Sequence, residues 1–143
     1  MNPFRLDALI TCYENLRLES VEDLAGYYAE DAYFKDPFNE VRGRAAILRI
    51  FTHMFSQVSE PRFAIVERVV DEHGAMLVWE FYYRAKLWGR GATQVMRGAS
   101  HLKFNSEGKV IWHRDYWDAA EELYAKLPVI GWLMRRLKKM MAS

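Results

Sequence analysis

At 143 residues, of which 51% are hydrophobic, the chain has the size of one compact domain with its own core. Its 20 Lys and Arg residues balance 19 Asp and Glu residues, and the formal net charge of +1 argues against a nucleic-acid-binding protein. The single cysteine, Cys12, excludes an intramolecular disulfide. No stretch approaches the roughly 18 apolar residues of a membrane-spanning helix, and no signal-peptide pattern is visible, so we expect a soluble, cytoplasmic protein.

The N-terminal part of the chain is predicted to be largely helical. Apolar residues recur at helical spacing over residues 4–18 and again over residues 43–58, and each set forms a stripe along one side of a helix. Between them, Ser20 begins a capping pattern that predicts a short helix over residues 21–30. A brief strand over residues 31–37 follows, because the residue before a proline is displaced from the helical region.

The chain after Pro61 is predicted to form four long strands. Runs of β-branched and aromatic residues alternate there with turns that contain glycine. The expected strands lie within residues 62–74, 75–91, 92–108 and 109–117. Helices followed by hairpin-connected strands indicate an α+β fold, in which the helices cover one face of a curved antiparallel sheet.

The chain ends in a basic amphipathic segment. After Pro128, apolar residues recur at helical spacing, and the opposite side of the helix carries Arg135, Arg136, Lys138 and Lys139. We expect residues 1–127 to form one domain, with residues 128–143 as a helix that packs on it. Contact of this helix with a membrane surface is the alternative that we favour less, and the helix is too short to cross a bilayer.

Three segments of the chain resemble a known superfamily. They are "YYAEDAYFKDP", "VRGRAAILRIF" and "LKFNSEGKVIWHRDYWD", and they resemble the nuclear transport factor 2-like superfamily, in particular its SnoaL-like and ketosteroid isomerase-like group. The resemblance extends over residues 6–120. It implies a cystatin-like α+β fold, a cone-shaped barrel of a strongly curved, mainly antiparallel sheet covered by N-terminal helices. The superfamily contains isomerases, cyclases, epoxide hydrolases, dehydratases and proteins without catalysis, so the fold does not determine the activity.

The resemblance also suggests site residues. Asp36, directly before Pro37, matches the general base of ketosteroid isomerases. The tyrosine that holds the oxyanion in those enzymes falls at Cys12, with Tyr13 next to it, and the second oxyanion residue falls at Ser100. Half of that oxyanion hole is therefore changed, which argues against a steroid isomerase but keeps a pocket for proton transfer. The other interpretation of Asp36 is a turn residue that hydrogen-bonds the backbone after Pro37.

The last predicted strand carries a second set of polar residues. Alternation along "VIWHRDYWD" places Ile111, His113, Asp115 and Trp117 on one face. The resemblance implies that this face lines the pocket, where SnoaL-like cyclases use an Asp and a His as acid and base. A His and an Asp two residues apart can hydrogen-bond, which holds one imidazole tautomer. Alternatively, Asp115 forms a structural ion pair with an arginine, and His113 is a packing residue.

We therefore expect a cofactor-free pocket for a small hydrophobic molecule with polyketide-, steroid- or terpene-like chemistry. The reaction would be that of an acid-base isomerase, cyclase, dehydratase or hydrolase, with the catalytic residues Asp36, His113 and Asp115. The expected substrate contacts are Cys12, Tyr13, Ser100 and Trp117. No spacing of His, Cys and acidic residues suggests a metal site.

Two alternatives remain open on the sequence. One is a non-catalytic ligand-binding or dimerisation module, and the other is a protein that docks to a membrane or a partner through its basic tail. In each case, the large aromatic residues over residues 75–88 predict a homodimer formed through the outer face of the sheet.

Overall fold

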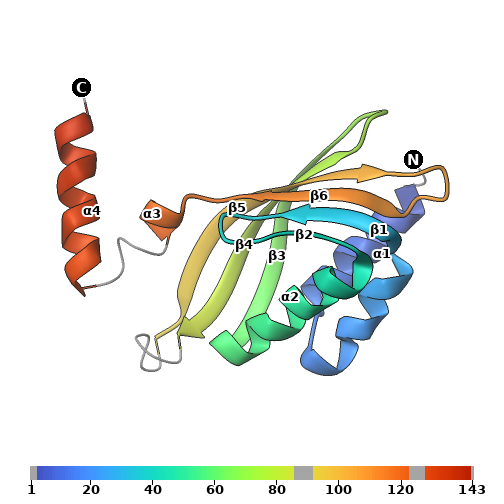
Figure 1. Ribbon diagram of the computed structural model, residues 1–143, viewed down its shortest axis with the longest axis horizontal. Coiled ribbons are helices and arrows are strands. Elements are labelled where there is room, and N and C mark those ends of the chain that lie inside the picture. Colours follow the sequence, from blue (N-terminus) through green and yellow to red (C-terminus); the bar gives the residue numbers. More distant parts are fainter. Residues whose placement is uncertain (1–2, 86–91, 123–127, 143) are drawn as a thin grey trace.

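The computed structural model describes residues 3–85, 92–122 and 128–142, and it shows helices packed on one face of a curved sheet (Figure 1). The helical segments on the sheet are α1 (Pro3–Glu14), the 3-10 helix η1 (Leu18–Gly26) and α2 (Arg44–Gln57). The strands are β1 (Tyr28–Lys35), β2 (Glu40–Arg42), β3 (Val58–Val70), β4 (Ala75–Ala85), β5 (Gln94–Phe104) and β6 (Val110–Tyr116). Two further helices follow the sheet, α3 (Ala119–Glu122) and α4 (Pro128–Met141).

The six strands form one sheet in the order β2-β1-β6-β5-β4-β3. The pair β1–β6 is parallel, whereas the other neighbouring strands are antiparallel. The sheet curves around the helices and does not close, since β2 and β3 lie at its two edges. This architecture confirms the expected α+β class with a mainly antiparallel, curved sheet.

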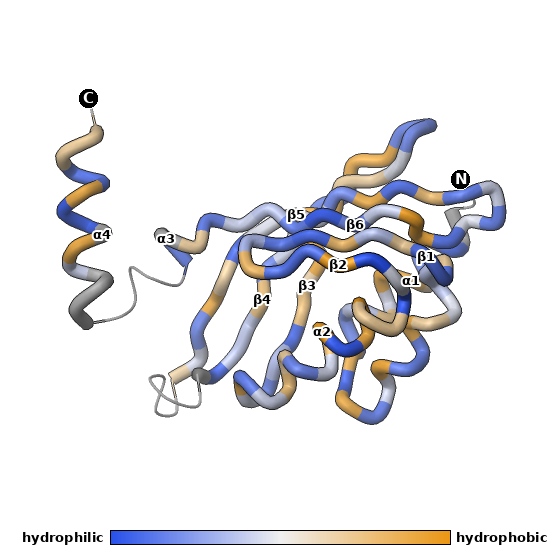
Figure 2. Tube along the Cα trace, viewed as in Figure 1, coloured by the Kyte–Doolittle hydropathy of each residue, from blue (hydrophilic) through white to orange (hydrophobic). Residues whose placement is uncertain are grey.

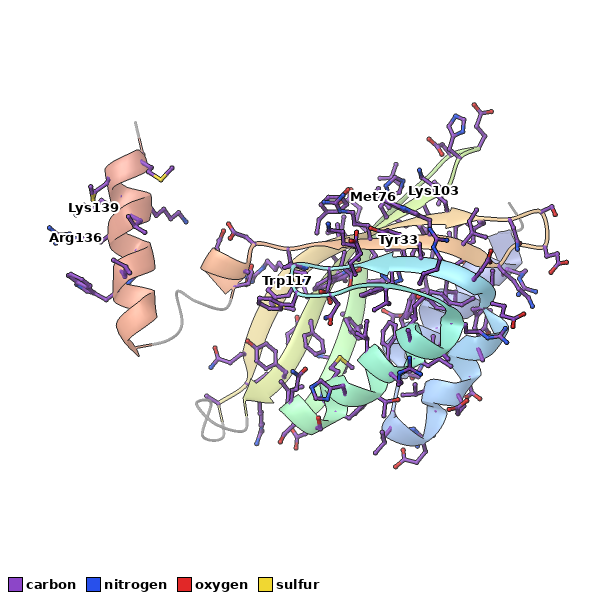
Figure 3. All side chains as sticks on the ribbon, viewed as in Figure 1. Tyr33, Met76, Lys103, Trp117, Arg136 and Lys139 are labelled. Atoms are coloured by element: carbon purple, nitrogen blue, oxygen red, sulfur yellow. The ribbon has the colours of Figure 1, made fainter. Side chains whose placement is uncertain are left out.

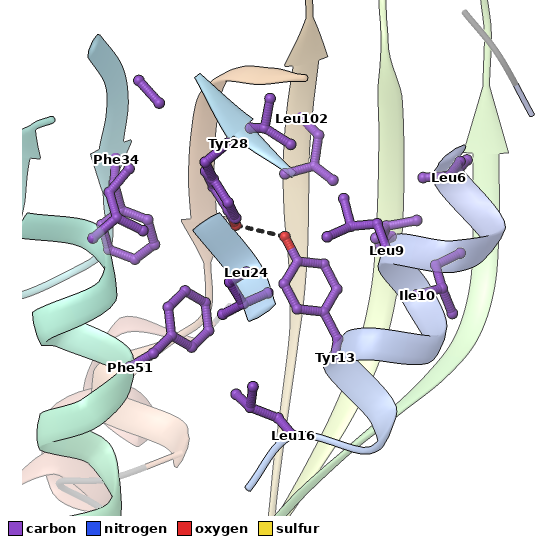
Figure 4. Packing of buried hydrophobic residues seen from close by; sticks show 14 of the residues in the cluster. Leu6, Leu9, Ile10, Tyr13, Leu16, Leu24, Tyr28, Phe34, Phe51 and Leu102 are labelled. Atoms are coloured by element: carbon purple, nitrogen blue, oxygen red, sulfur yellow. Dashed lines mark hydrogen bonds between the residues drawn. The ribbon is translucent and has the colours of Figure 1, made fainter. Parts of the chain in front are cut away.

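The main core lies between the helices and the concave face of the sheet (Figure 4). Helical spacing in α1 and α2 turns one side of each helix toward the sheet, and the inward residues of the strands meet it. The buried members from α1 and α2 are Leu6, Leu9, Ile10, Tyr13, Ile47 and Phe51, those from η1 are Val21 and Leu24, and those from the sheet include Tyr28, Phe34, Leu77 and Leu102. A second aromatic cluster of Trp79, Phe81 and Tyr83 continues this face along β4.

Three elements differ from the sequence-based expectation. The helix predicted over residues 21–30 is wrong in its second half, because Tyr28 already begins a strand that pairs with β6. The strand predicted to begin after Pro61 begins at Val58 instead. Pro61 is accommodated because β3 is an edge strand and its pairing with β4 is irregular between Ser59 and Arg62. The short strand β2 was not predicted.

The C-terminal helix α4 lies apart from the sheet and from the other described helices (Figure 1). Its hydrophobic and hydrophilic residues alternate along the helix (Figure 2), and several large apolar side chains are exposed. Packing of this helix on residues 1–127 therefore stays a prediction. No helix in the described part of the chain is both long and apolar enough to cross a membrane.

Candidate functional site

A pocket of about 540 Å³ lies where the C-terminal ends of β1 and β6 meet. These two strands run in parallel, and Lys35 is the register partner of Arg114, so their ends reach the same edge of the sheet. The pocket is lined by Lys35, Asp36, Pro37, Arg114, Asp115, Tyr116, Trp117 and Asp118. Three residues that the sequence singled out, Asp36, Asp115 and Trp117, thus line one pocket.

Asp36 also organises the turn that follows β1. Its Oδ1 accepts hydrogen bonds from the backbone N–H of Phe38 at 2.8 Å and of Asn39 at 2.6 Å. The Asn39 side-chain amide lies 3.1 Å from both carboxylate oxygens. Asp36 therefore has the geometry of the turn residue that was one of its two interpretations, while its side chain lines the pocket as the other interpretation required.

On the concave side of the sheet, two side chains hydrogen-bond the Asp115 carboxylate. His113 Nε2 lies 2.6 Å from Asp115 Oδ1, and the Ser100 hydroxyl donates to the same oxygen at 2.5 Å. Trp79 Nε1 in turn donates to Ser100 Oγ at 2.9 Å. Among the described residues, Asp115 hydrogen-bonds His113 and forms no ion pair with an arginine.

The other ring nitrogen of His113, Nδ1, contacts a buried tyrosine of the core. His113 Nδ1 lies 2.7 Å from the Tyr28 hydroxyl, and the Tyr28 hydroxyl lies 2.5 Å from that of Tyr13 (Figure 4). Burial is the main cause that raises the pKa of both phenols far above the ordinary tyrosine value. Both tyrosines therefore keep their protons and can donate them within this chain of contacts.

One assignment of protons gives every donor of this network an acceptor. An indole N–H can only donate, so the Ser100 hydroxyl accepts a hydrogen bond from Trp79. The same hydroxyl donates its own hydrogen bond to Asp115. An ionised Asp115 can only accept, which places a proton on His113 Nε2. A neutral imidazole then accepts at Nδ1 from Tyr28, and Tyr28 accepts from Tyr13.

The reverse assignment leaves a buried donor unsatisfied. If His113 carried a proton on Nδ1, Tyr28 would have to donate to Tyr13. The Tyr13 proton would then have no acceptor among the described residues, although this side chain is only 6% exposed. Because an unsatisfied buried donor is costly, the geometry favours neutral His113 with its proton on Nε2, facing Asp115.

Strand register explains why these side chains meet. Ser100 is the cross-strand partner of both Leu77 and Asp115, and Leu102 is the partner of His113, so the polar residues share the concave face. Ile111 was expected on this face too, and that expectation is wrong. A register shift between Lys103 and Phe104 leaves Ile111 without a partner on β5, and its side chain is exposed.

The network contains two residues that the sequence did not reveal, Tyr28 and Trp79. Tyr28 falls within the helix predicted over residues 21–30, and Trp79 falls among the aromatic residues of 75–88 from which the homodimer is predicted. Tyr13 and Ser100, expected as substrate contacts, lie instead behind Asp115 in the same network. Cys12 packs beside the main core, outside the pocket, and burial followed by the charge of Asp23 raises the pKa of its thiol.

An aromatic pair lies at the pocket, with Trp117 in its lining and Phe38 next to Trp117. The rings of Phe38 and Trp117 meet edge to face with their centroids 5.5 Å apart, and the Phe38 side chain is largely exposed. Such a surface beside a carboxylate suits an apolar molecule with one reactive polar group. Within the described residues, no three His, Cys, Asp or Glu side chains are placed to hold a metal ion.

Comparisons with known structures show the same fold. A hypothetical protein of ketosteroid isomerase-like fold from Catenulispora acidiphila, solved with trimethylamine, superposes with a TM-score of 0.72 at 14% identity and covers 90% of this chain and 96% of its own. An LEH-like epoxide hydrolase from M. tuberculosis gives 0.66 at 14% identity over 97% and 92% of the two chains. A steroid delta-isomerase from Pseudomonas aeruginosa gives 0.62 at 17% identity over 99% and 94%.

Sequence comparison assigns the family. No curated protein matches the chain. The family described as the SnoaL-like domain matches residues 9–113, which is well over half of the chain. The matched region begins within α1 and ends at His113, so it includes Tyr13, Tyr28 and Ser100 of the network. The chain therefore belongs to the SnoaL-like domain family, and it shares the fold of ketosteroid isomerase-like proteins.

Proposed function

We propose that this protein binds a small hydrophobic molecule in the pocket between the ends of β1 and β6 and moves a proton on it without a cofactor. The observation that carries the proposal is the environment of Asp115. One of its carboxylate oxygens is fixed by His113 and Ser100, while the side chain remains 19% exposed and lines the pocket. A carboxylate that is held on one side and open on the other can act as a general base.

The remaining residues have distinct roles in this proposal. Asp115 Oδ2 takes the proton, since no donor among the described residues reaches it. The neutral His113 and Ser100 orient the carboxylate through Oδ1, and Tyr28 and Tyr13 hold the imidazole in the required tautomer. Asp36 and Trp117 line the same pocket and would contact the substrate there. Asp36 is available as the second carboxyl group of an acid-base pair.

The reaction class follows from the available groups. Of the three carboxyl groups that line the pocket, Asp36 and Asp115, together with the aromatic ring of Trp117, suit isomerisation, cyclisation, dehydration or hydrolysis of a polyketide-, steroid- or terpene-like molecule. Structural neighbours described as an epoxide hydrolase and a steroid isomerase support acid-base chemistry on this fold. The same proposal includes a homodimer and a cytoplasmic location. A single cysteine, Cys12, suits the reducing environment of the cytoplasm.

A second candidate is a binding module without catalysis. The carboxylate of Asp36, the residue that matches the isomerase base, already accepts hydrogen bonds from Phe38 and Asn39. A carboxylate used in this way is less available to a substrate. On this alternative, the pocket retains a ligand but leaves it unchanged.

The test is turnover of a panel of steroid, terpene and polyketide ketones and epoxides in D₂O, with mass spectrometry of the products. We expect the wild-type protein to hydrolyse, isomerise or deuterate at least one of them, and Asp115→Asn to do so at least about 100-fold more slowly. Asp31→Asn, an exposed acid of β1 outside the pocket, is the matched control and should keep the wild-type rate. Binding without any turnover by the wild type would contradict catalysis and support the binding module.

A further inference from the structure

The C-terminal helix α4 presents an apolar face that nothing in the described structure covers. Leu133, Leu137, Met140 and Met141 are each between 42% and 84% exposed. At 100° per residue these four positions fall within an arc of about 100° on one side of the helix. Figure 2 shows the resulting bands of hydrophobic and hydrophilic residues along α4. A continuous apolar stripe of this kind requires an apolar environment that the domain does not supply in this structure.

The side of α4 away from this stripe carries four cations and Trp132. Arg135, Arg136, Lys138 and Lys139 project from it, and all four are exposed. The Arg136 guanidinium lies over the Trp132 ring, 5.5 Å from its centroid. Residues 128–142 contain no acidic side chain and no Ser, Thr, Asn or Gln. The helix thus has no acidic or uncharged polar side chain, and its charged residues are all cationic.

We propose that α4 is an interfacial helix that binds the surface of an anionic lipid membrane. Its apolar stripe would enter the boundary between headgroups and acyl chains, while the four cations would remain at the level of the anionic headgroups. The 14-residue helix measures only about 21 Å, shorter than the roughly 30 Å hydrocarbon core, so it lies in the membrane plane instead of crossing it.

Charge complementarity selects the lipid surface over a protein groove. A groove that accepted α4 would need acidic groups on both rims of an apolar floor to meet cations that flank the stripe. Figure 3 shows Arg136 and Lys139 projecting from α4 with no other element beside them. An anionic membrane provides negative charge on both sides of the stripe at once. The proposal does not depend on the proposed catalysis, because Asp115 and the pocket contribute nothing to it.

The experiment uses the full-length chain with two kinds of vesicle, phosphatidylcholine alone and phosphatidylcholine mixed with phosphatidylglycerol. We expect cosedimentation with the mixed vesicles and little with phosphatidylcholine alone. Lys138→Gln combined with Lys139→Gln should weaken binding about 25-fold, since each cation near an anionic surface contributes roughly fivefold. Leu133→Glu combined with Leu137→Glu should abolish it. Both pairs lie on exposed positions, so the fold should survive.

Two matched controls separate this result from others. Lys138→Arg with Lys139→Arg should keep wild-type binding, and so should Leu18→Glu, the same apolar-to-acid change at an exposed position in η1. The Asp115→Asn variant should also bind the mixed vesicles as the wild type does. A failure of the proposed catalysis can then be distinguished from a failure of the proposed membrane binding.

Three outcomes would overturn the proposal. They are no binding to the mixed vesicles, equal binding to phosphatidylcholine alone, or unchanged binding of the Leu133→Glu/Leu137→Glu variant. Amide hydrogen exchange over residues 128–141 gives a further reading. Protection of these amides without vesicles, unaltered by their addition, would mean that the helix packs on its own domain instead.

Discussion

The Tyr28 hydroxyl occupies the middle of the buried network, where it donates to His113 and accepts from Tyr13. Tyr28→Phe would leave His113 Nδ1 without a donor and Tyr13 without an acceptor inside the core. We expect a loss of about 1–3 kcal/mol in the free energy of unfolding, measured by urea denaturation. Tyr13→Phe should cost less, because Tyr28 would still donate its proton to His113.

The ordering of these two substitutions tests the assigned direction of the hydrogen bonds. If Tyr13→Phe destabilised the protein more than Tyr28→Phe, protons would not run from Tyr13 through Tyr28 to His113. Tyr27→Phe is the control, since the Tyr27 hydroxyl makes no hydrogen bond within the described residues. The double variant should lose less than the sum of the single losses, as expected for residues of one network.

At the scale of elements, β5 and β4 approach closely at Gly98. Gly98 is the register partner of Trp79, and a Cβ on Gly98 would lie 2.5 Å from Trp79 Cη2 and 2.9 Å from the Tyr116 carbonyl oxygen. Gly98→Ala must therefore displace the indole that donates to Ser100. We expect a loss of about 1–3 kcal/mol in the free energy of unfolding, the usual cost of overpacking.

The matched control for this change is Gly26→Ala at the end of η1, where a Cβ would meet nothing within 4 Å. It should alter the free energy of unfolding by well under 1 kcal/mol. Equal stability of the two alanine variants would show that Trp79 can move without cost, and the indole could then not be a fixed support of Ser100.

At the scale of the whole molecule, the convex face of the sheet has no helix over it in the described structure (Figure 3). Tyr33, Met76 and Lys103 lie on this face, opposite to the side on which α1 and α2 pack. We expect this face to form the homodimer that the sequence predicts. Sedimentation at micromolar concentration should then give twice the chain mass of 16.9 kDa.

A substitution on this face should dissociate the dimer without unfolding the domain. Met76→Glu places a charge among the outward residues of β4 and should give a species of 16.9 kDa. Leu18→Glu, on the helical side, should leave the dimer intact. A wild-type protein that sediments only as a monomer would contradict the interface altogether.

The fold class could be predicted from the sequence because it depends on local patterns. Helical spacing in α1 and α2, and glycine-bounded runs of β-branched and aromatic residues in β3 to β6, are visible in a single chain. The helix predicted over residues 21–30 failed where the competing interaction was distant. Tyr28 adopts a strand conformation because it pairs with β6, some 80 residues later in the chain. Local sequence propensity carries no information about such a distant pairing.

The site divides in the same way. Sequence alone determined that His113 and Asp115 share one side of a strand, because alternation along an extended chain is a local property. Only the tertiary structure decided that Tyr28, Ser100 and Trp79 complete the network, since three different strands bring them to the same face. It also placed Asp36 beside Asp115, because the parallel pairing of β1 with β6 aligns the ends of two strands that are far apart in the chain.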